Sequence, residues 1–227
     1  RYIGEDFALA EAGEKPEDTV WVVFANGLAP DRGERRIDLP VFLVTKQVQY
    51  TGIALPKLMY RNEGASYLTV TSGDSEVNTE TICDMDAVVA TEFKKDLPGV
   101  VTRELTRAAI KTAAQYVAYE AASSASGGGS DGELYGRLAS GAVALYQVAT
   151  TAADVRCWSA LPKNFQIARV KMPEDGLVTV KPEMAPAVDV EIPECDNAII
   201  YVRMINKNTK PIAVVIPINP TEERIVS

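Results

Sequence analysis

The chain contains no histidine among its 227 residues. Histidine is the commonest general base in enzymes and the commonest protein ligand for metals. Ser-His-Asp and Cys-His catalytic mechanisms therefore cannot be assembled from this chain alone. Histidine zinc sites are excluded as well, and three scattered cysteines make a poor thiolate site. We accordingly expect no catalytic residue, no metal and no cofactor, and a protein that is not an enzyme.

Cysteine is scarce, and its spacing is uninformative. Cys83, Cys157 and Cys195 form an odd set without a CxxC motif. We interpret all three as small buried hydrophobic residues, because free cysteine is usually buried. The alternative is a disulfide bond between Cys157 and Cys195, which flank β-like segments, in an oxidising compartment.

Long apolar runs and excess positive charge are also missing. The longest charge-free stretch, residues 138–153, is shorter than the ~20 apolar residues that span a bilayer. The chain begins Arg-Tyr-Ile-Gly, without an initiator methionine or a signal peptide, so we expect a piece of a longer protein. The net charge of -8 repels phosphate backbones, and we expect no nucleic-acid partner.

What the sequence does have is a set of short β-branched and aromatic segments separated by turn residues. Residues 1–18 are expected to be a lead-in segment, and residues 19–227 a single β-rich domain. Asn26-Gly27 is a turn signal, after which a second strand is expected to return. The spacing predicts an antiparallel sandwich. The expected strands are residues 19–25, 36–44, 52–58, 65–71, 165–170, 177–180, 188–192, 198–205 and 211–218.

Between these strands, residues 84–153 have the period of α-helices. We predict a short helix that ends near Asp96, a second helix whose first turn holds Pro98, and a third helix over residues 133–153. A Gly- and Ser-rich stretch, residues 123–132, is expected to be a flexible linker. One face of the second helix is predicted to hold Val101, Leu105, Ala108, Thr112, Tyr116 and Tyr119.

The third predicted helix is as rich in small residues as the second, so their backbones can approach closely and form an antiparallel hairpin. Its predicted face holds Leu134, Leu138, Ala142, Leu145 and Ala149. The fold class we expect is therefore α+β, an antiparallel β-sandwich-like body interrupted by a central helical hairpin.

The charge-free stretch 138–153 allows two interpretations. If both faces are covered, it is a central helix, and if one face is bare, it is an oligomer or partner interface. The candidate interface residues are Leu138, Ala142, Leu145, Tyr146 and Ala149. A separate candidate is an aromatic ligand platform made of Trp158, Tyr116 and Tyr119, although Trp158 also suits packing where the helices meet the sheet.

Three polar clusters have simpler explanations than a binding site. The acidic residues Glu80, Asp84 and Asp86 lack the spacing of a calcium loop, and we interpret them as helix capping. The basic stripe Arg103, Arg107 and Lys111 either is a solvated helix face or contacts anionic lipid headgroups or an acidic partner. Residues 127–129 lack the Gly-Lys-Ser/Thr of a phosphate loop and are taken as part of the linker.

Five strings together resemble the C-terminal part of an uncharacterised family of proteobacterial cell-envelope lipoproteins. They are residues 26–30 (NGLAP), 52–56 (GIALP), 84–93 (DMDAVVATEF), 97–103 (LPGVVTR) and 158–162 (WSALP). Members of that family resemble proteins with three parts in order: an acylated N-terminal cysteine, a tetratricopeptide-like helical region and a domain similar to residues 20–218. This chain lacks the lipobox cysteine and the helical repeats.

The resemblance implies a location, in the periplasm or associated with the outer membrane, and gives no activity. Membrane association is implied only through a lipid anchor that this sequence does not contain. The function we expect is a non-enzymatic cell-envelope scaffold or assembly protein that acts through protein–protein contacts, as a homo- or hetero-oligomer. The alternative is a periplasmic ligand-binding module for a cell-wall glycan or peptide.

Overall fold

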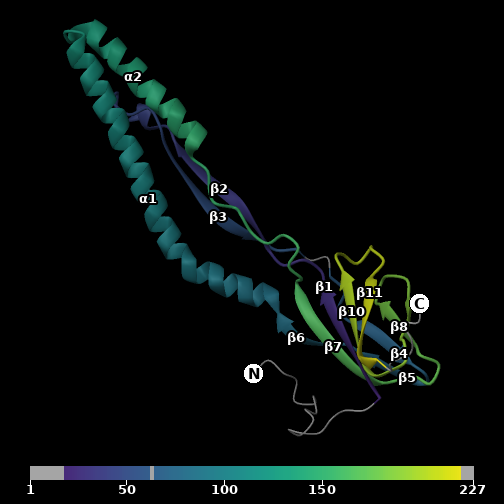
Figure 1. The fold of residues 1–227 in the computed structure, drawn as a ribbon. Helices are drawn as coiled ribbons and strands as arrows, with labels where there is room; N and C mark the ends of the chain where they lie inside the picture. Colours follow the sequence, from purple (N-terminus) through teal and green to yellow (C-terminus); the bar gives the residue numbers. More distant parts are fainter. Residues whose placement is uncertain (1–17, 62–63, 221–227) are drawn as a thin grey trace, which may run out of the picture. The chain divides into compact units, whose positions relative to one another are not determined.

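A computed structural model describes residues 18–61 and 64–220, and the protein is α+β as expected, with three mostly antiparallel sheets and a helical hairpin in the middle of the chain (Figure 1). The lead-in segment 1–18 lies almost entirely outside the described residues. The chain forms two compact units. We call residues 1–30, 60–90 and 158–227 the sandwich unit, and residues 31–59 and 91–157 the helical unit.

The sandwich unit contains a five-stranded sheet with the order β11-β10-β1-β7-β6. Its neighbours are antiparallel except β1 and β10, which are parallel. The strands are β1 (Thr19–Asn26), β6 (Glu80–Asp84), β7 (Asn164–Lys171), β10 (Cys195–Met204) and β11 (Ile212–Pro220).

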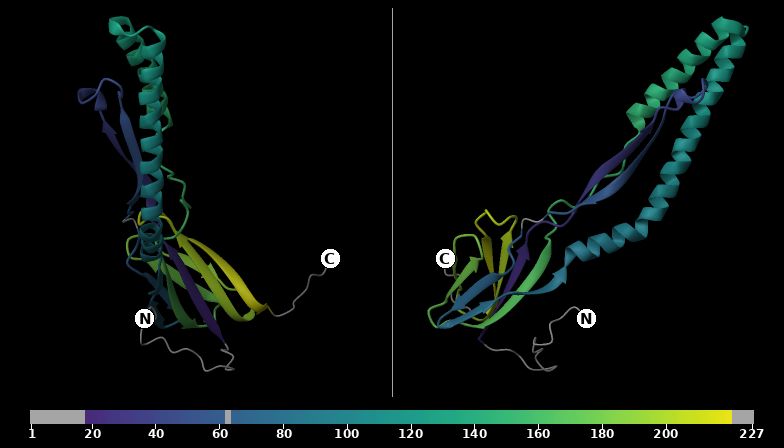
Figure 2. Two further views of the ribbon diagram at one scale, coloured as in Figure 1. Left: turned by 90° about the vertical axis from the view of Figure 1, so that its left-hand side faces the viewer. Right: turned by 180° about the vertical axis from the view of Figure 1, so that it is seen from behind.

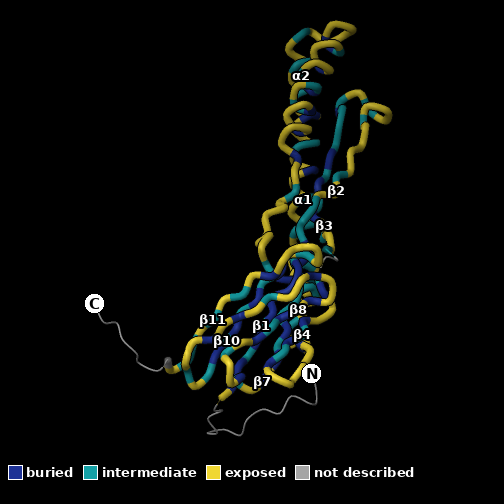
Figure 3. The backbone as a smooth tube through the Cα atoms, turned by 90° about the vertical axis from the view of Figure 1, so that its right-hand side faces the viewer, coloured by how far each residue is buried: buried dark blue, intermediate teal, exposed yellow. Residues whose placement is uncertain are grey.

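A four-stranded sheet of order β5-β4-β8-β9 completes this unit. Its strands are β4 (Leu68–Ser72), β5 (Ser75–Asn78), β8 (Leu177–Pro182) and β9 (Val188–Glu191). Alternate side chains of both sheets meet in one apolar core, which is coloured dark blue in Figure 3. Its fully buried members include Phe24, Leu68, Val180 and Ile200.

Asn26 and Gly27 form the predicted turn, but the chain does not return beside β1. The backbone N–H of Gly27 donates to the Met204 carbonyl, and Gly27 has a φ of +61°, which glycine tolerates. The amide of Asn26 is buried, donates to the Ala65 carbonyl and accepts from the Ala65 N–H. This pairing fixes the turn against residues 64–65, and the next strand belongs to the helical unit.

The helical unit combines a two-stranded ribbon with the helical hairpin (Figure 2). The ribbon consists of β2 (Asp31–Leu39) and β3 (Thr51–Met59), paired antiparallel, with a short 3₁₀ helix, η1 (Val41–Leu43), between them. The prediction of a strand over residues 36–44 is wrong after Leu39, because Pro40 cannot donate to the ladder and instead starts η1.

The two helices are α1 (Met85–Ala125) and α2 (Gly129–Thr150), and the first turns of α1 belong to the sandwich unit. The predicted break at Asp96 is wrong, because α1 continues through Pro98 at the expense of one backbone hydrogen bond. The predicted linker 123–132 is also too long. The helices extend into both of its ends and leave only residues 126–128 as the connection.

Small residues bring the helices into close contact, as their composition predicted. A Cβ atom on Gly136 would lie 2.9 Å from the ring of Tyr119, and one on Gly132 would lie 2.8 Å from the carbonyl oxygen of Ser123. Neither position has room for a side chain. The hairpin therefore closes over glycines, in the manner of small-residue helix contacts.

Candidate functional site

Helix α2 turns its large apolar residues outward. Leu138 is 62 % exposed, Leu145 73 % and Tyr146 66 %. Ala142 and Ala149, the other two predicted interface residues, are exposed as well. Residues 138–153 therefore have one bare face, which was the second of the two interpretations (yellow in Figure 3).

The buried side of α2 is made of small and polar residues instead. They recur at spacings of four, four, four and three along the helix, and they are Gly132, Gly136, Ser140, Ala144 and Gln147. Helix α1 buries Ala108, Gln115 and Tyr119, while Leu105 and Tyr116 are about half exposed. The predicted face of α2 is therefore not the face that packs within the unit, and the predicted face of α1 packs only in part, through Ala108 and Tyr119.

A glutamine at the centre of the unit ties the hairpin to the ribbon. Gln115 is completely buried, and its Nε2 donates to the Tyr50 carbonyl and to Oε1 of Gln147. Its Oε1 accepts from the backbone N–H groups of Gln49 and Tyr50, at 2.9 and 3.2 Å. All four hydrogen-bonding positions of this amide are filled. Nε2 of Gln147, also buried, has no partner among the described residues.

An arginine from the ribbon caps the C-terminus of α2. The Arg36 guanidinium donates to the carbonyls of Val148 and Thr151, both at 3.1 Å, where the helix has free acceptors and a negative partial charge. It also donates to Oδ1 of Asp38 and to the hydroxyl of Tyr50, both at 2.8 Å. These bonds hold the end of α2 against β2.

The same contacts shift the titration of all three groups. Its hydrogen bonds to Asp38 and to Tyr50 raise the pKa of Arg36 above its usual range. The Arg36 guanidinium, with help from the Tyr50 hydroxyl, lowers the pKa of Asp38. Burial and the neighbouring Asp38 raise the pKa of Tyr50, against the effect of Arg36.

An open apolar groove of about 520 Å³ runs along the outward face of α2 where β3 begins. Three of the predicted interface residues line it, Leu138, Ala142 and Leu145, and most of its lining surface is apolar. The lining residues are Gln49, Tyr50, Arg137, Leu138, Gly141, Ala142, Ala144, Leu145 and Val148. Nearby, Lys46 forms an ion pair with Glu133 of α2 at 3.0 Å, and the loop that carries it exposes Phe42, Leu43 and Val44.

The aromatic platform is not assembled from its three predicted members. Tyr119 is only 8 % exposed and packs against Gly136, so its ring offers no face to a ligand. Tyr116 is half exposed on α1 in the helical unit. Trp158 belongs to the sandwich unit, where its side chain is largely exposed rather than packed under a junction.

Two members of the acidic cluster make local contacts at the start of α1. Oδ1 of Asp84 accepts from the N–H groups of Asp86 and Ala87, which confirms a capping role for Asp84, and Asp86 is ion-paired with Lys163. Within residues 18–61 and 64–220, no three histidine, cysteine, aspartate or glutamate side chains gather as metal ligands would. Neither of the two α-helices in these described residues is long and apolar enough to cross a membrane.

The three cysteines are free and are not the buried residues we predicted. Cys157 is exposed, and its thiol donates to Oδ1 of Asp31 at 2.7 Å. Cys83 and Cys195 are half-buried, and burial raises the pKa of Cys195. Cys157 and Cys195 belong to different units.

Sequence reasoning did not identify Gln115, Gln147 or Arg36. A signal was present, because the small and polar residues of α2 recur at helical spacing as regularly as its leucines do. No protein-family model, no curated protein and no solved structure matches this chain.

Proposed function

We propose that this protein is a non-enzymatic scaffold or assembly protein that acts through protein–protein contacts made by the outward face of α2. The observation that carries the proposal is the inverted pattern of that helix. Leucine and tyrosine are exposed, while glycine, serine and glutamine are buried. The same helix also exposes Leu134, Tyr135 and Val148, and a contiguous exposed apolar surface is typical of an interaction site.

The spacing on this face suits a helix as the partner. Its apolar positions, completed by one glycine, recur at intervals of four, three, four and three, which is the repeat of a coiled-coil seam. They are Leu134, Leu138, Gly141, Leu145 and Val148. A partner helix would place its side chains in the groove over Gly141 and Ala142, where small residues leave room.

The first partner to test is a second copy of the chain. Light scattering of the whole chain over a concentration series should then give a discrete multiple of 24.5 kDa that persists on dilution. Leu145→Glu should shift this mass to that of the monomer. Met184→Glu, a matched change at a residue 69 % exposed in the sandwich unit, should leave it unchanged.

If wild type is a monomer at every concentration, self-association is ruled out and the partner must be another protein. A photo-crosslinking residue at position 145 should then capture a protein that the same residue at position 184 does not. Equal crosslinking at the two positions would contradict a contact role for α2. The resemblance of the five strings supports a cell-envelope setting, and fractionation of cells that express the protein would test it.

A further inference from the structure

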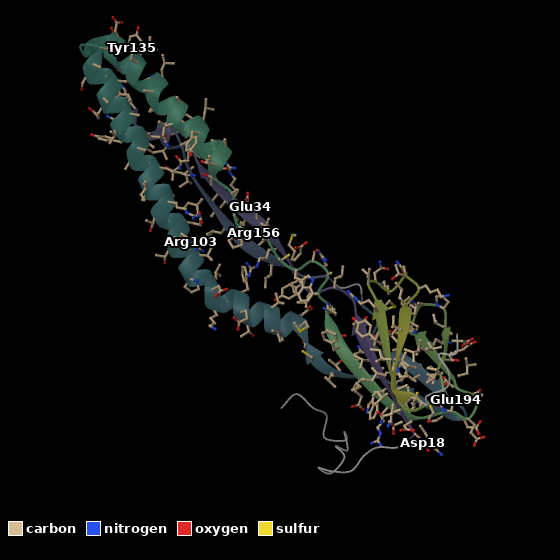
Figure 4. The ribbon with its side chains drawn as sticks, viewed as in Figure 1. Asp18, Glu34, Arg103, Tyr135, Arg156 and Glu194 are labelled. Atoms are coloured by element: carbon tan, nitrogen blue, oxygen red, sulfur yellow. The ribbon has the colours of Figure 1, made fainter. Side chains whose placement is uncertain are left out.

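A second groove of the helical unit is lined by arginines. It has a volume of about 740 Å³ and lies among the ribbon, the first half of α1 and the segment that follows α2. Arg103 and Arg107 come from α1, Arg32 from β2 and Arg156 from the segment after α2. Figure 4 shows Arg103 on the helix, and Arg156 and Glu34 beside the strands.

Two of these arginines are already neutralised. Arg107 is paired with Glu104 at 2.6 Å, and Arg156 is paired with Asp154 through two nitrogens at 2.9 and 3.0 Å. The Arg156 guanidinium lowers the pKa of Asp154, which favours the ionised carboxyl group that this pair needs. These pairs contribute little net charge to the groove.

The other two cations form no ion pair with a carboxylate of the described residues, although the positive charge of Arg32 helps to lower the pKa of Asp154. The Arg32 guanidinium lies 5.9 Å from the centre of the Phe93 ring, a cation–π distance that leaves its N–H groups available. Arg103 makes no hydrogen bond or ion pair with the residues that the structure describes. The one unpaired carboxylate that lines the groove is Asp96, in a chain whose net charge is -8.

Apolar residues make up the smaller part of the lining. Ala54 and Pro56 of β3 are buried, and Leu97 and Val100 of α1 are half-buried. A groove of this volume holds a small organic molecule. Arginine forks bind carboxylate or phosphate oxygens with two parallel hydrogen bonds, and an adjacent apolar lining accommodates a hydrocarbon chain.

We propose that this groove binds an amphiphilic oxyanion, a carboxylate or phosphate ester joined to an apolar chain, with Arg103 and Arg32 holding the anionic head. The proposal is independent of the contact role of α2, because α2 does not line this groove. Of the basic stripe Arg103, Arg107 and Lys111 on α1, Arg103 would bind this anion, whereas Arg107 is already paired with Glu104.

The test is calorimetric titration of the whole chain with octyl phosphate and with octanoate, each below its micelle concentration. We expect saturable binding of at least one of them that weakens with added salt. Arg103→Gln should weaken it at least tenfold, since a hydrogen bond to a charged group is lost. Arg169→Gln, a matched change at an exposed arginine of β7 in the sandwich unit, should leave it unchanged.

The probes also distinguish the possible sources of the anion. Stronger binding of octyl phosphate than of octanoate indicates a phosphate ester, and the reverse indicates a carboxylate. Inorganic phosphate should bind more weakly than octyl phosphate, because it has no apolar chain. Absence of binding by both probes would overturn the proposal, as would equal binding of neutral octyl glucoside or an equal effect of the two arginine substitutions.

Discussion

The two units bury opposite kinds of residue. The sandwich unit closes over valine, isoleucine, leucine and phenylalanine. The helical unit closes over glycine, alanine and two glutamines, and it exposes Leu138, Leu145 and Tyr146. Burial of apolar area is the main favourable term in folding, so the sandwich unit uses its apolar residues for its own stability. The helical unit leaves much of that area available to a partner.

The largest predicted effect contrasts one residue from each unit. Phe24 is completely buried in the sandwich core, and Phe24→Ala should lower the free energy of unfolding by about 3–5 kcal/mol through lost burial and a cavity. Leu145→Ala in α2 should change it by no more than about 0.5 kcal/mol in the monomer, since that side chain is exposed. Urea unfolding of both variants measures the difference. Similar losses would mean that the outward face of α2 is packed within the monomer.

The next effect tests the polar core of the helical unit. Gln115→Leu would leave the half-buried N–H groups of Gln49 and Tyr50 and the Tyr50 carbonyl without their partner, and we expect a loss of about 1–3 kcal/mol. Gln147→Leu should cost less, because Nε2 of Gln147 already lacks a partner. Helical circular dichroism during unfolding reports on this unit. A larger loss of stability for Gln147→Leu than for Gln115→Leu would mean that Gln147, and not Gln115, is the main polar contact of this unit.

An effect of similar size separates the two sides of α2. Gly136→Ala should destabilise the hairpin by about 1–3 kcal/mol, because the new methyl group meets Tyr119. Gly141→Ala has open space around it and should stabilise the helix by up to about 1 kcal/mol through helix propensity. Thermal unfolding of the two variants gives the signs. If both substitutions stabilise the protein, the helices do not pack through Gly136.

Whether a strand could be predicted depended on its local sequence pattern. Strand β1 is rich in β-branched and aromatic residues, β10 alternates apolar residues with others, and these local patterns identified both strands. Strand β6 was missed because its sequence, ETICD, is polar and lies exposed at a sheet edge. The parallel pairing of β1 with β10 joins residues almost 180 positions apart, and no local pattern encodes it.

The packing face of α2 was not predictable for a different reason. The sequence left open whether Leu138 and Leu145 are covered or form a bare interface face, because apolar periodicity alone does not show which face of a helix packs. Glycine and glutamine decide it instead, through close backbone approach and hydrogen bonds to the ribbon. The candidate interface residues are exposed, and their role in an interface stays a prediction, while the polar residues that hold α2 in place were not found.

The smallest predicted effect concerns acid. Arg36 and Tyr50 lower the pKa of Asp38 in the folded protein below its usual value near 4. The unfolded chain therefore binds a proton at this position more readily than the folded chain does, and stability falls as the pH falls through the folded pKa. Asp38→Asn should be less stable than wild type at pH 6, and the difference should shrink between about pH 5 and pH 2. Asp189→Asn, a matched change at an exposed carboxylate of β9 in the sandwich unit, is the control for general acid effects. A difference between wild type and Asp38→Asn that stays constant over this range would show that the charge of Asp38 does not contribute to the contact between Arg36 and the end of α2.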